Sequence, residues 1–282
     1  MDIRILALDL DGTLLTNHNS VSEACRNAVQ LARKKGVQAV ICTGRNAADS
    51  CMFAEQAGGM DWAITANGAE IRSLQDPSIT IAEPLGEHLC QTLVSLCSGF
   101  EGADPCFYTA DAVYYGASFE QFIRDCAAHG HQFNFSERNH YHRIPDCSWD
   151  AFIRAHRGSI LKAILHASDP SAVDRMHEAV AADGRFETAP SEMFGGALKN
   201  IEVNRRGVTK GRALATLAAR LGCSMPNVMA VGDSDNDLSM IRMAGLGVAM
   251  GNAPAHIRAA ADAVTDDNRA DGAARAIERW LL

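Results

Sequence analysis

The stretch that decides the fold stands near the beginning of the chain and reads Arg4-Ile5-Leu6-Ala7-Leu8-Asp9-Leu10-Asp11-Gly12-Thr13-Leu14-Leu15. Its apolar run is typical of a buried parallel strand, yet the run ends in two carboxylates, Asp9 and Asp11. Like charges this close raise each other's pKa unless a cation compensates them. Mg²⁺ is the simplest such cation, because it prefers oxygen ligands and binds carboxylates beside phosphate groups. The first strand thus predicts a cation site at its carboxyl end.

A second stretch, Asn227-Val228-Met229-Ala230-Val231-Gly232-Asp233-Ser234-Asp235-Asn236-Asp237, repeats this arrangement. Two such strands would deliver carboxylates to one edge of a sheet, where open α/β sheets bind their ligands. Asp and Asn at strand-to-helix turns also serve as helix caps, and that alternative stays open for each cluster by itself. A cap needs only one oxygen, so the two clusters together favour a ligand site.

Two further segments point to a bound anion. Gly36–Arg45 is an apolar run that ends in Thr43 and Gly44, where backbone N–H groups can face an anion. Val208-Thr209-Lys210-Gly211 begins a helix and places Lys210 in its first turn, away from the end where the helix dipole favours a cation. By itself this position favours a solvated lysine, whereas beside a bound phosphate Lys210 would be a ligand of the anion.

These motifs, in this order, resemble the haloacid dehalogenase superfamily, in particular its Cof-type, class IIB phosphatases. The resemblance is carried by Asp-x-Asp-Gly-Thr-Leu, Thr-Gly-Arg, Gly-Val-Thr-Lys-Gly and Gly-Asp-x-x-Asn-Asp. Three further stretches are similar to the family: Ala66–Ala69, Gly247–Ala253 and Ala261–Thr265. The likeness covers roughly residues 1–83 and 205–282 and fades between them.

The resemblance implies an α/β fold with a Rossmann-like parallel-sheet core, residues 1–83 and 205–282, and an inserted α+β cap, residues 84–204, that governs substrate specificity. Alternating apolar runs and helical patterns agree with such a core. In the core we expect strands at 4–10, 37–42, 62–66, 227–231 and 246–250, and helices near 22–35, 46–57, 209–221, 235–243, 254–260 and 271–281. In the cap we expect apolar strands separated by helices near 86–98, 118–129 and 171–182.

Phosphoryl transfer needs a nucleophile, a cation that screens the phosphate oxygens and an acid for the leaving alcohol. By position in the motifs, the resemblance implies that Asp9 is the nucleophile and Asp11 the general acid and base. It also implies that Mg²⁺ is held by the Asp9 carboxylate, the Asp11 backbone carbonyl and Asp233, with Asp237 bracing the site. The phosphate ligands that it implies are Thr43, Gly44, Lys210 and Asn236.

The expected function is hydrolysis of small phosphate monoesters, such as sugar or cofactor phosphates, with Mg²⁺ as cofactor. A phosphomutase of the same superfamily is the alternative. A non-catalytic protein that binds phosphorylated metabolites is a weaker alternative, because Asp9, Asp11, Lys210 and Asp233 are all present. Dehalogenation is disfavoured because Asp11 and the metal carboxylates would have no use in it.

Composition limits the partners. The 282 residues fit two domains, and a net charge of −8 argues against nucleic acid or an anionic membrane as a partner. The sequence shows neither an apolar run long enough to span a bilayer nor the pattern of a signal peptide, so we expect a cytoplasmic protein. We also expect a monomer or a homodimer. The expected partner is a small phosphorylated substrate.

The nine cysteines include no Cys-x-x-Cys pair and are odd in number, so we expect reduced thiols, with Cys25 on the apolar stripe of a helix. His129, His131, His140 and His142 stand at alternate positions and could form a substrate patch or a second metal site. Solvated surface is the favoured alternative for these histidines, because no third metal ligand is evident.

Overall fold

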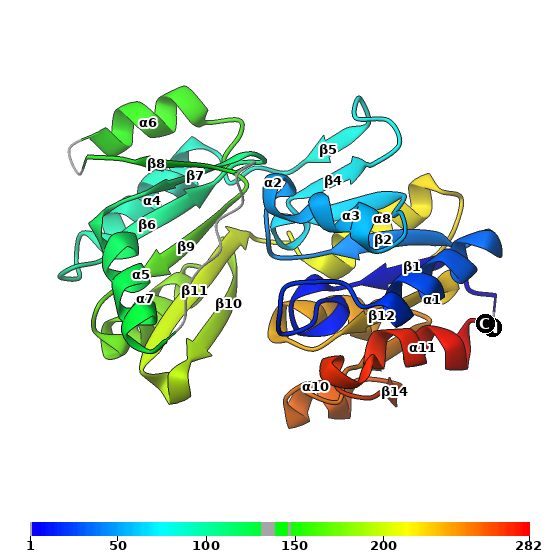
Figure 1. Ribbon diagram of the computed structural model, residues 1–282. Coiled ribbons are helices and arrows are strands. Elements are labelled where there is room, and N and C mark those ends of the chain that lie inside the picture. The colour runs from blue at the N-terminus through cyan, green and yellow to red at the C-terminus, as the bar shows by residue number, and fades with distance from the viewer. Residues whose placement is uncertain (1, 131–138, 146–147) are drawn as a thin grey trace. The chain divides into compact units, whose positions relative to one another are not determined.

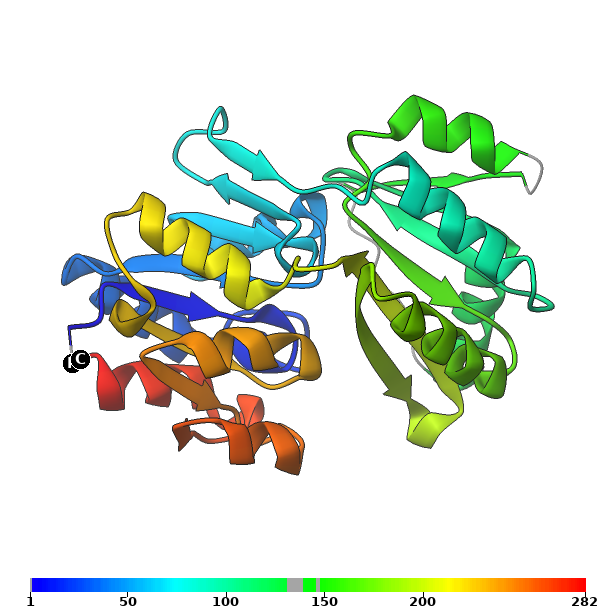
Figure 2. The ribbon, with the colours of Figure 1, turned by 180° about the vertical axis from the view of Figure 1, so that it is seen from behind.

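The computed structural model describes residues 2–130, 139–145 and 148–282. The chain divides into two compact units, one made of Met1–Ala82 and Thr209–Leu282 and the other of Glu83–Val208. Figures 1 and 2 show each unit as a sheet with helices packed on it. The limits expected for the inserted segment, 84 and 204, lie one and four residues inside those of the second unit.

The first unit, the core, holds a sheet of eight strands in the order β14-β13-β12-β1-β2-β3-β4-β5. In the same order these strands are Ala263–Val264, Leu246–Ala249, Val228–Gly232, Ile5–Leu8, Gln38–Cys42, Trp62–Thr65, Glu70–Ser73 and Thr80–Ala82. β1 is central and pairs in parallel with β12 and β2, with Leu8 opposite Val231 and Ile41. All four residues of β1 are buried, as expected for a central parallel strand covered on both faces. The α/β fold class is confirmed.

Two strands at one edge of this sheet depart from the expected parallel arrangement. β4 and β5 continue the sheet from β3 in antiparallel fashion. β5 is exposed or half-buried along its length, and β4 begins with Glu70, whose side chain accepts a hydrogen bond from Thr65. Neither strand has the continuous apolar run by which β1, β2, β3, β12 and β13 were predicted, and the two-residue strand β14 was not predicted either.

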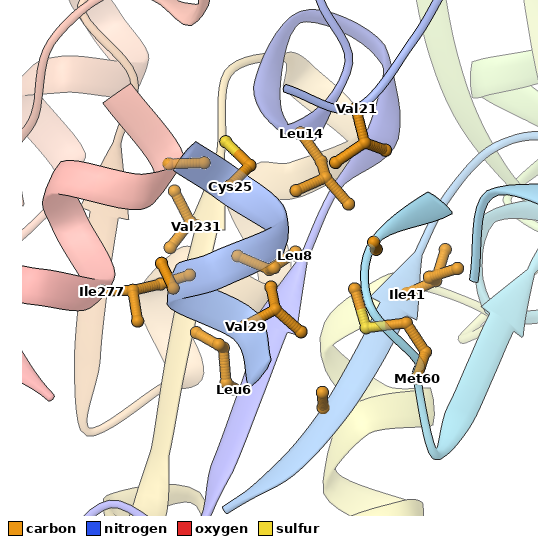
Figure 3. Close-up of a cluster of buried hydrophobic side chains, with 14 of the residues drawn as sticks. Leu6, Leu8, Leu14, Val21, Cys25, Val29, Ile41, Met60, Val231 and Ile277 are labelled. Atoms are coloured by element: carbon orange, nitrogen blue, oxygen red, sulfur yellow. The ribbon is translucent and has the colours of Figure 1, made fainter. Parts of the chain in front are cut away.

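Helices cover both faces of the core sheet. One apolar cluster joins Leu6 and Leu8 to α1 and α11, as Figure 3 shows, and another joins Ile5 and Ala7 to α8 and α9. The helix expected at 46–57 is interrupted at Cys51. The core helices are α1 (Glu23–Lys34), α2 (Ala47–Ser50), α3 (Met52–Gln56), α8 (Lys210–Arg220), α9 (Leu238–Met243), α10 (Ala255–Ala260) and α11 (Gly272–Trp280).

The helix α1 illustrates how the sequence builds this layer. The Ser22 side chain caps its first turn by accepting a hydrogen bond from the Cys25 N–H at 3.1 Å. Its buried stripe consists of Cys25, Ala28, Val29 and Ala32, which confirms the predicted apolar role of Cys25. None of the eight cysteines that the structure describes is joined in a disulfide, and Cys147 lies outside the described residues.

The second unit holds a six-stranded sheet in the order β10-β11-β9-β6-β7-β8. α4, α6 and α7 pack on one face around Phe107, and α5 packs on the other against Cys106 and Val113. The strands are Phe186–Met193, Leu198–Arg205, Lys162–His166, Asp104–Tyr108, Ala112–Tyr115 and His140–Arg143, in sheet order. The helices are α4 (Glu87–Cys97), α5 (Ala117–Ala128), α6 (Trp149–His156) and α7 (Pro170–Asp183). The helix α6 and the long β10–β11 hairpin were not predicted.

Of the four histidines at alternate positions in the sequence, the three that the structure describes lie on the surface of this unit. His140 and His142 are exposed on the strand β8, and the exposed His129 ring lies 2.8 Å from the carbonyl oxygen of Asp125. His131 lies outside the described residues. Within those residues, no group of histidine, cysteine or acidic side chains in this unit has the spacing of metal ligands. Among the described helices, none combines the length and the apolar character that crossing a membrane requires.

Candidate active site

A buried lysine links two carboxylates at the carboxyl end of the core sheet. Lys210 Nζ donates hydrogen bonds to Asp9 Oδ1 at 2.7 Å and to Asp237 Oδ1 at 2.6 Å. Asp9 follows β1, and Lys210 begins α8, whose first turn is capped by the Thr209 hydroxyl. Lys210 and Asp237 are 0% exposed and Asp9 is 4% exposed, which excludes the solvated alternative for Lys210.

Asp237 also forms hydrogen bonds with the backbone of the loop after β12. Its Oδ2 accepts hydrogen bonds from the backbone N–H groups of Asp233 at 2.9 Å and Ser234 at 3.0 Å. The helix-cap alternative thus describes part of what Asp237 does. It does not describe Asp9, whose side chain makes no cap hydrogen bond.

Asp233 is held beside this pair. Thr13 donates a hydrogen bond from Oγ1 to Asp233 Oδ1 at 2.8 Å, and a Cβ on Gly12 would lie 2.4 Å from Asp233 Oδ2. One carboxylate oxygen from each of Asp9, Asp233 and Asp237 lies within 4.8 Å of the others. In the part of the chain that the structure describes, this is the single group of acidic, histidine or cysteine side chains with such spacing.

The charges at this site are not balanced by the protein. The three carboxylates and the one ammonium leave two net negative charges. Burial, and next the charge of Asp237, raise the pKa of Asp9 well above its usual value, and the same two causes raise the pKa of Asp233 to about 7. Burial lowers the pKa of Lys210, but the charges of Asp237 and Asp9 outweigh it and raise that pKa overall. A hard divalent cation that takes oxygen ligands, such as Mg²⁺, fits both the donor atoms and the charge.

The Asp11 carboxylate lies outside this group. Its side chain is 53% exposed and forms an ion pair with Arg45, whose Nε and Nη2 lie 2.7 and 2.5 Å from the two carboxylate oxygens. Arg45 Nη2 also donates to Asn19 Oδ1 at 3.1 Å. Arg45 follows Thr43 and Gly44 after β2, so the Thr-Gly-Arg motif contacts the Asp-x-Asp motif directly.

The other expected phosphate ligands flank the carboxylates. The β1–β2 register aligns Leu8 with Ile41, which places Thr43 just past the position opposite Asp9. The Thr43 hydroxyl is buried and accepts a hydrogen bond from the Arg45 N–H at 3.1 Å. Asn236 is half-buried, and its Nδ2 donates to Asn67 Oδ1 at 3.1 Å.

A family of haloacid dehalogenase-like hydrolases matches residues 6–277 of the chain. The chain belongs to the haloacid dehalogenase-like hydrolases. It is of the Cof-type, and it shares its fold with the subclass IIB sugar phosphatase BT4131, with a TM-score of 0.78 and 22% identity over 98% of each chain.

Two curated relatives of this hydrolase are named as phosphatases. It is 34% identical to the 5-amino-6-(5-phospho-D-ribitylamino)uracil phosphatase YcsE of Bacillus subtilis, over 100% of this chain and 97% of the relative. It is 29% identical to the pyridoxal phosphate phosphatase YbhA of Escherichia coli over the full length of both. This haloacid dehalogenase-like hydrolase is accordingly a phosphoric monoester hydrolase.

Sequence reasoning missed several residues that support the site of this hydrolase. Arg45, Thr13 and Asn67 hold Asp11, Asp233 and Asn236 through the hydrogen bonds given above, and Asn252 Nδ2 donates to the Gly12 carbonyl at 2.9 Å. Asn67 and Asn252 lie in stretches that resemble the family, and Asn67 has a φ of 59°, a left-handed conformation that asparagine tolerates. The motifs located these residues, but they did not indicate which side chains touch.

Proposed function

We propose that this chain hydrolyses small phosphate monoesters through a covalent phosphoryl intermediate on Asp9, with Mg²⁺ as its cofactor. The observation that carries the proposal is the buried Lys210 ammonium between Asp9 and Asp237, beside Asp233. A lysine that binds the Asp9 carboxylate favours its ionised form and fixes its direction. An ionised carboxylate at the end of a parallel strand is suited to attack a phosphorus atom.

In the first step, an Asp9 carboxylate oxygen attacks phosphorus, and the bond from phosphorus to the ester oxygen breaks. The leaving oxygen keeps the electron pair and takes a proton from Asp11. In the second step, water attacks the phosphorus of the aspartyl-phosphate and gives a proton to Asp11. The bond from phosphorus to Asp9 then breaks, which releases inorganic phosphate and restores the carboxylate.

The remaining residues hold the phosphate and the metal. The Thr43 hydroxyl, the Gly44 N–H, Lys210 and Asn236 would bind phosphate oxygens. The Asp9 and Asp233 carboxylates and the Asp11 backbone carbonyl would hold Mg²⁺. Asp237 suits a bracing role, because Lys210 and two backbone N–H groups already occupy its two oxygens. When bound, the metal screens the charge of the phosphate, so that attack by an anion becomes feasible.

The relatives suggest which substrates to try first. The names of YcsE and YbhA point to 5-amino-6-(5-phospho-D-ribitylamino)uracil and pyridoxal phosphate, and the fold shared with a sugar phosphatase adds sugar phosphates. We further propose that the enzyme acts in the cytosol as a monomer or homodimer, without a nucleic-acid or membrane partner.

The test is phosphate release from these substrates in Mg²⁺ or in EDTA, with wild-type protein and Asp9→Asn. We expect release that requires the metal and is lost in Asp9→Asn, while the far-UV spectrum and the melting temperature stay at wild-type values. Asp76→Asn, in the exposed turn between β4 and β5, is the matched control and should keep full activity. Mass spectrometry of acid-quenched wild-type enzyme should find a phosphoryl group on Asp9. Substantial metal-dependent activity in Asp9→Asn would contradict the covalent step, and release that needs a bisphosphate activator would indicate a mutase.

A further inference from the structure

The turn between β3 and β4 is left-handed at three successive residues. Ala66, Asn67 and Gly68 have φ values of 49°, 59° and 103°. Residues other than glycine seldom adopt such values, and the alanine side chain has no polar group that would favour them. The turn is also buried, with Ala66 0% exposed and Asn67 5% exposed. Strain of this kind persists where surrounding contacts hold it in place, and it is concentrated at functional sites.

The second unit contains the same kind of turn without an asparagine. Phe194–Gly196, between β10 and β11, has φ values of 53°, 68° and 88° in chain order. Both turns join antiparallel strands. Gly195 takes the place of Asn67 in this second turn, so glycine is sufficient to form it. The left-handed backbone therefore does not explain why the first turn has an asparagine.

The Asn67 side chain contacts a residue that is distant in the sequence. Its Oδ1 accepts a hydrogen bond from Asn236 Nδ2 at 3.1 Å, and Ser234 Oγ donates a hydrogen bond to Asn236 Oδ1 at 2.8 Å. These two contacts fix both ends of the Asn236 carboxamide, because its oxygen accepts and its nitrogen donates. Asn67 takes up one of the two N–H groups of Nδ2. Within the described part of the chain, the other N–H makes no hydrogen bond.

The backbone of the turn is held by two segments of the site. Its first two N–H groups donate hydrogen bonds to the carbonyl oxygens of Arg45 at 2.8 Å and Thr43 at 3.0 Å. A Cβ on Gly68 would lie 2.4 Å from the carbonyl oxygen of Thr209, which directly precedes the buried lysine of the site. The turn thus packs between the loop after β2 and the start of α8. These contacts fix the direction in which the Asn67 side chain leaves the backbone.

We propose, resting on the phosphatase function and the phosphate-binding role of Asn236 proposed above, that Asn67 is a positioning residue for phosphoryl transfer. It keeps an N–H of the Asn236 carboxamide, and not the carbonyl oxygen, directed at a phosphate oxygen. Phosphate oxygens are negatively charged acceptors, so a carboxamide binds them only through its N–H groups. An amide free to rotate would also present its oxygen, which repels the anion. The turn thus pre-organises a phosphate ligand that lies on another segment.

The test removes the Asn67 side chain and keeps the turn. Asn67→Gly introduces the residue that Gly195 supplies in the second unit, so the left-handed backbone is retained. We expect the inhibition constant of inorganic phosphate in Mg²⁺ to rise about tenfold, because a hydrogen bond to a charged group is weakened. KM for p-nitrophenyl phosphate should rise by a similar factor. Its kcat should stay within about threefold of wild type, because the affected contact binds phosphate oxygens before and during the reaction alike.

A double-mutant cycle separates positioning from a general loosening of the site. Asn236→Ala should by itself raise the inhibition constant of inorganic phosphate about tenfold. In Asn67→Gly the same substitution should add less than about twofold, because Asn67 acts through Asn236 alone. In Asn67→Asp, which keeps an acceptor for Nδ2, Asn236→Ala should again cost about tenfold. This last pair also serves the test if Asn67→Gly does not fold.

Asn227→Gly is the matched control, because it makes the same exchange in the same unit. Asn227 stands directly before β12, at the end of that strand opposite to Asp233, and its Nδ2 donates to the Asp2 carbonyl at 2.9 Å. The substitution removes an asparagine hydrogen bond that is not part of the site. It should leave the inhibition constant, KM and kcat at wild-type values.

Three results would overturn the inference. They are a wild-type inhibition constant in Asn67→Gly, a wild-type inhibition constant in Asn236→Ala, and losses from these two substitutions that multiply in the double variant. Each of these results leaves hydrolysis through Asp9 standing. Wild-type enzyme that releases no phosphate from any ester would overturn both proposals.

Discussion

The guanidinium of Arg45 binds both oxygens of the Asp11 carboxylate, with Nε 2.7 Å from one and Nη2 2.5 Å from the other. Such bidentate pairing fixes a carboxylate in direction as well as in place. If Asp11 is the general acid, one of its oxygens must carry the proton to the leaving group. At least one of the two hydrogen bonds from Arg45 must then break during turnover. Arg45 thus acts as a positioning residue for Asp11.

Replacing Arg45 should affect substrates according to their leaving groups. We expect Arg45→Met to lower kcat for alkyl phosphates by about tenfold and Asp11→Asn to lower it by about 10²–10⁴-fold, the usual range for a general acid. p-Nitrophenyl phosphate should lose much less in both variants, because its leaving group needs no proton. The measurement is kcat for a series of esters of rising leaving-group pKa.

The control for this series is Arg33→Met, which removes another bidentate pair of the core, between Arg33 and Asp61 at 2.7 and 3.1 Å. It should not alter kcat for any ester. An equal loss for good and poor leaving groups in Arg45→Met would show that Arg45 does not act through Asp11.

Lys210→Met should destabilise the core, because it leaves Asp9 and Asp237 as neighbouring buried carboxylates without their cation. Loss of one member of a buried ion pair typically costs about 3–5 kcal/mol in the free energy of unfolding, which urea titration in EDTA measures. Added Mg²⁺ should restore part of the loss if the cation binds these carboxylates. Lys199, on β11, pairs with the exposed carboxylates of Asp174 at 2.9 Å and Glu192 at 3.1 Å. Lys199→Met gives the comparison and should cost far less stability than Lys210→Met. A Lys210→Met variant as stable as wild type in EDTA would contradict the charge balance described here.

The environment of Lys210 also shows what could not be predicted from the sequence, namely whether its side chain is buried and which groups it contacts. The motif placed Lys210 in the first turn of a helix, a position that by itself favoured a solvated side chain over a phosphate ligand. Its burial depends on Asp9 and Asp237, which are 201 and 27 residues away in the chain. Strands and the α/β fold follow from local apolar periodicity, whereas such pairings depend on how distant segments pack.

The parts of the fold that were not predicted have weak local signals. β4 and β5 lack apolar runs, and α6, Trp149–His156, stands directly after a segment without clear periodicity. The contact from Arg45 to Asp11 was missed for a different reason. Both motifs were recognised, but a sequence motif does not show which side chains contact each other in the folded protein.

Gly12→Ala should disturb Asp233 by direct contact. A Cβ at Gly12 would lie 2.4 Å from Asp233 Oδ2, and the φ of Gly12 is 81°, which disfavours any side chain. We expect weaker activation by Mg²⁺, seen as a rise of about tenfold or more in the metal concentration for half-maximal activity.

Gly36→Ala is the control, because Gly36 has a φ of 85° and no atom within 4 Å of the added Cβ. It introduces the same backbone strain, of order 1 kcal/mol, and should leave metal activation unchanged. Equal effects of the two substitutions would mean that backbone strain, and not the contact with Asp233, is responsible.

His166 should make the second unit sensitive to acid. His166 is 2% exposed, its ring centroid lies 4.4 Å from that of Phe122, and neither ring nitrogen has a hydrogen-bond partner among the residues that the structure describes. Burial lowers the pKa of His166 to about 3, below the value of about 6.5 for an unfolded chain. Between these two values the unfolded chain binds a proton that the folded protein does not. The free energy of unfolding should therefore fall as the pH falls below about 6.5, by about 1.4 kcal/mol per pH unit.

His166→Leu removes the proton-binding site and keeps an apolar side chain against Phe122. Relative to the variant, wild-type protein should lose about 2 kcal/mol of unfolding free energy between pH 7 and pH 5, measured by urea titration of the transition that reports on the second unit. His140→Leu, on the exposed strand β8, is the control, because that ring meets water in the folded and the unfolded chain alike. Parallel pH profiles for wild type and His166→Leu would mean that His166 takes up its proton in the folded protein. Burial against Phe119 and Phe122 would then not keep the ring neutral.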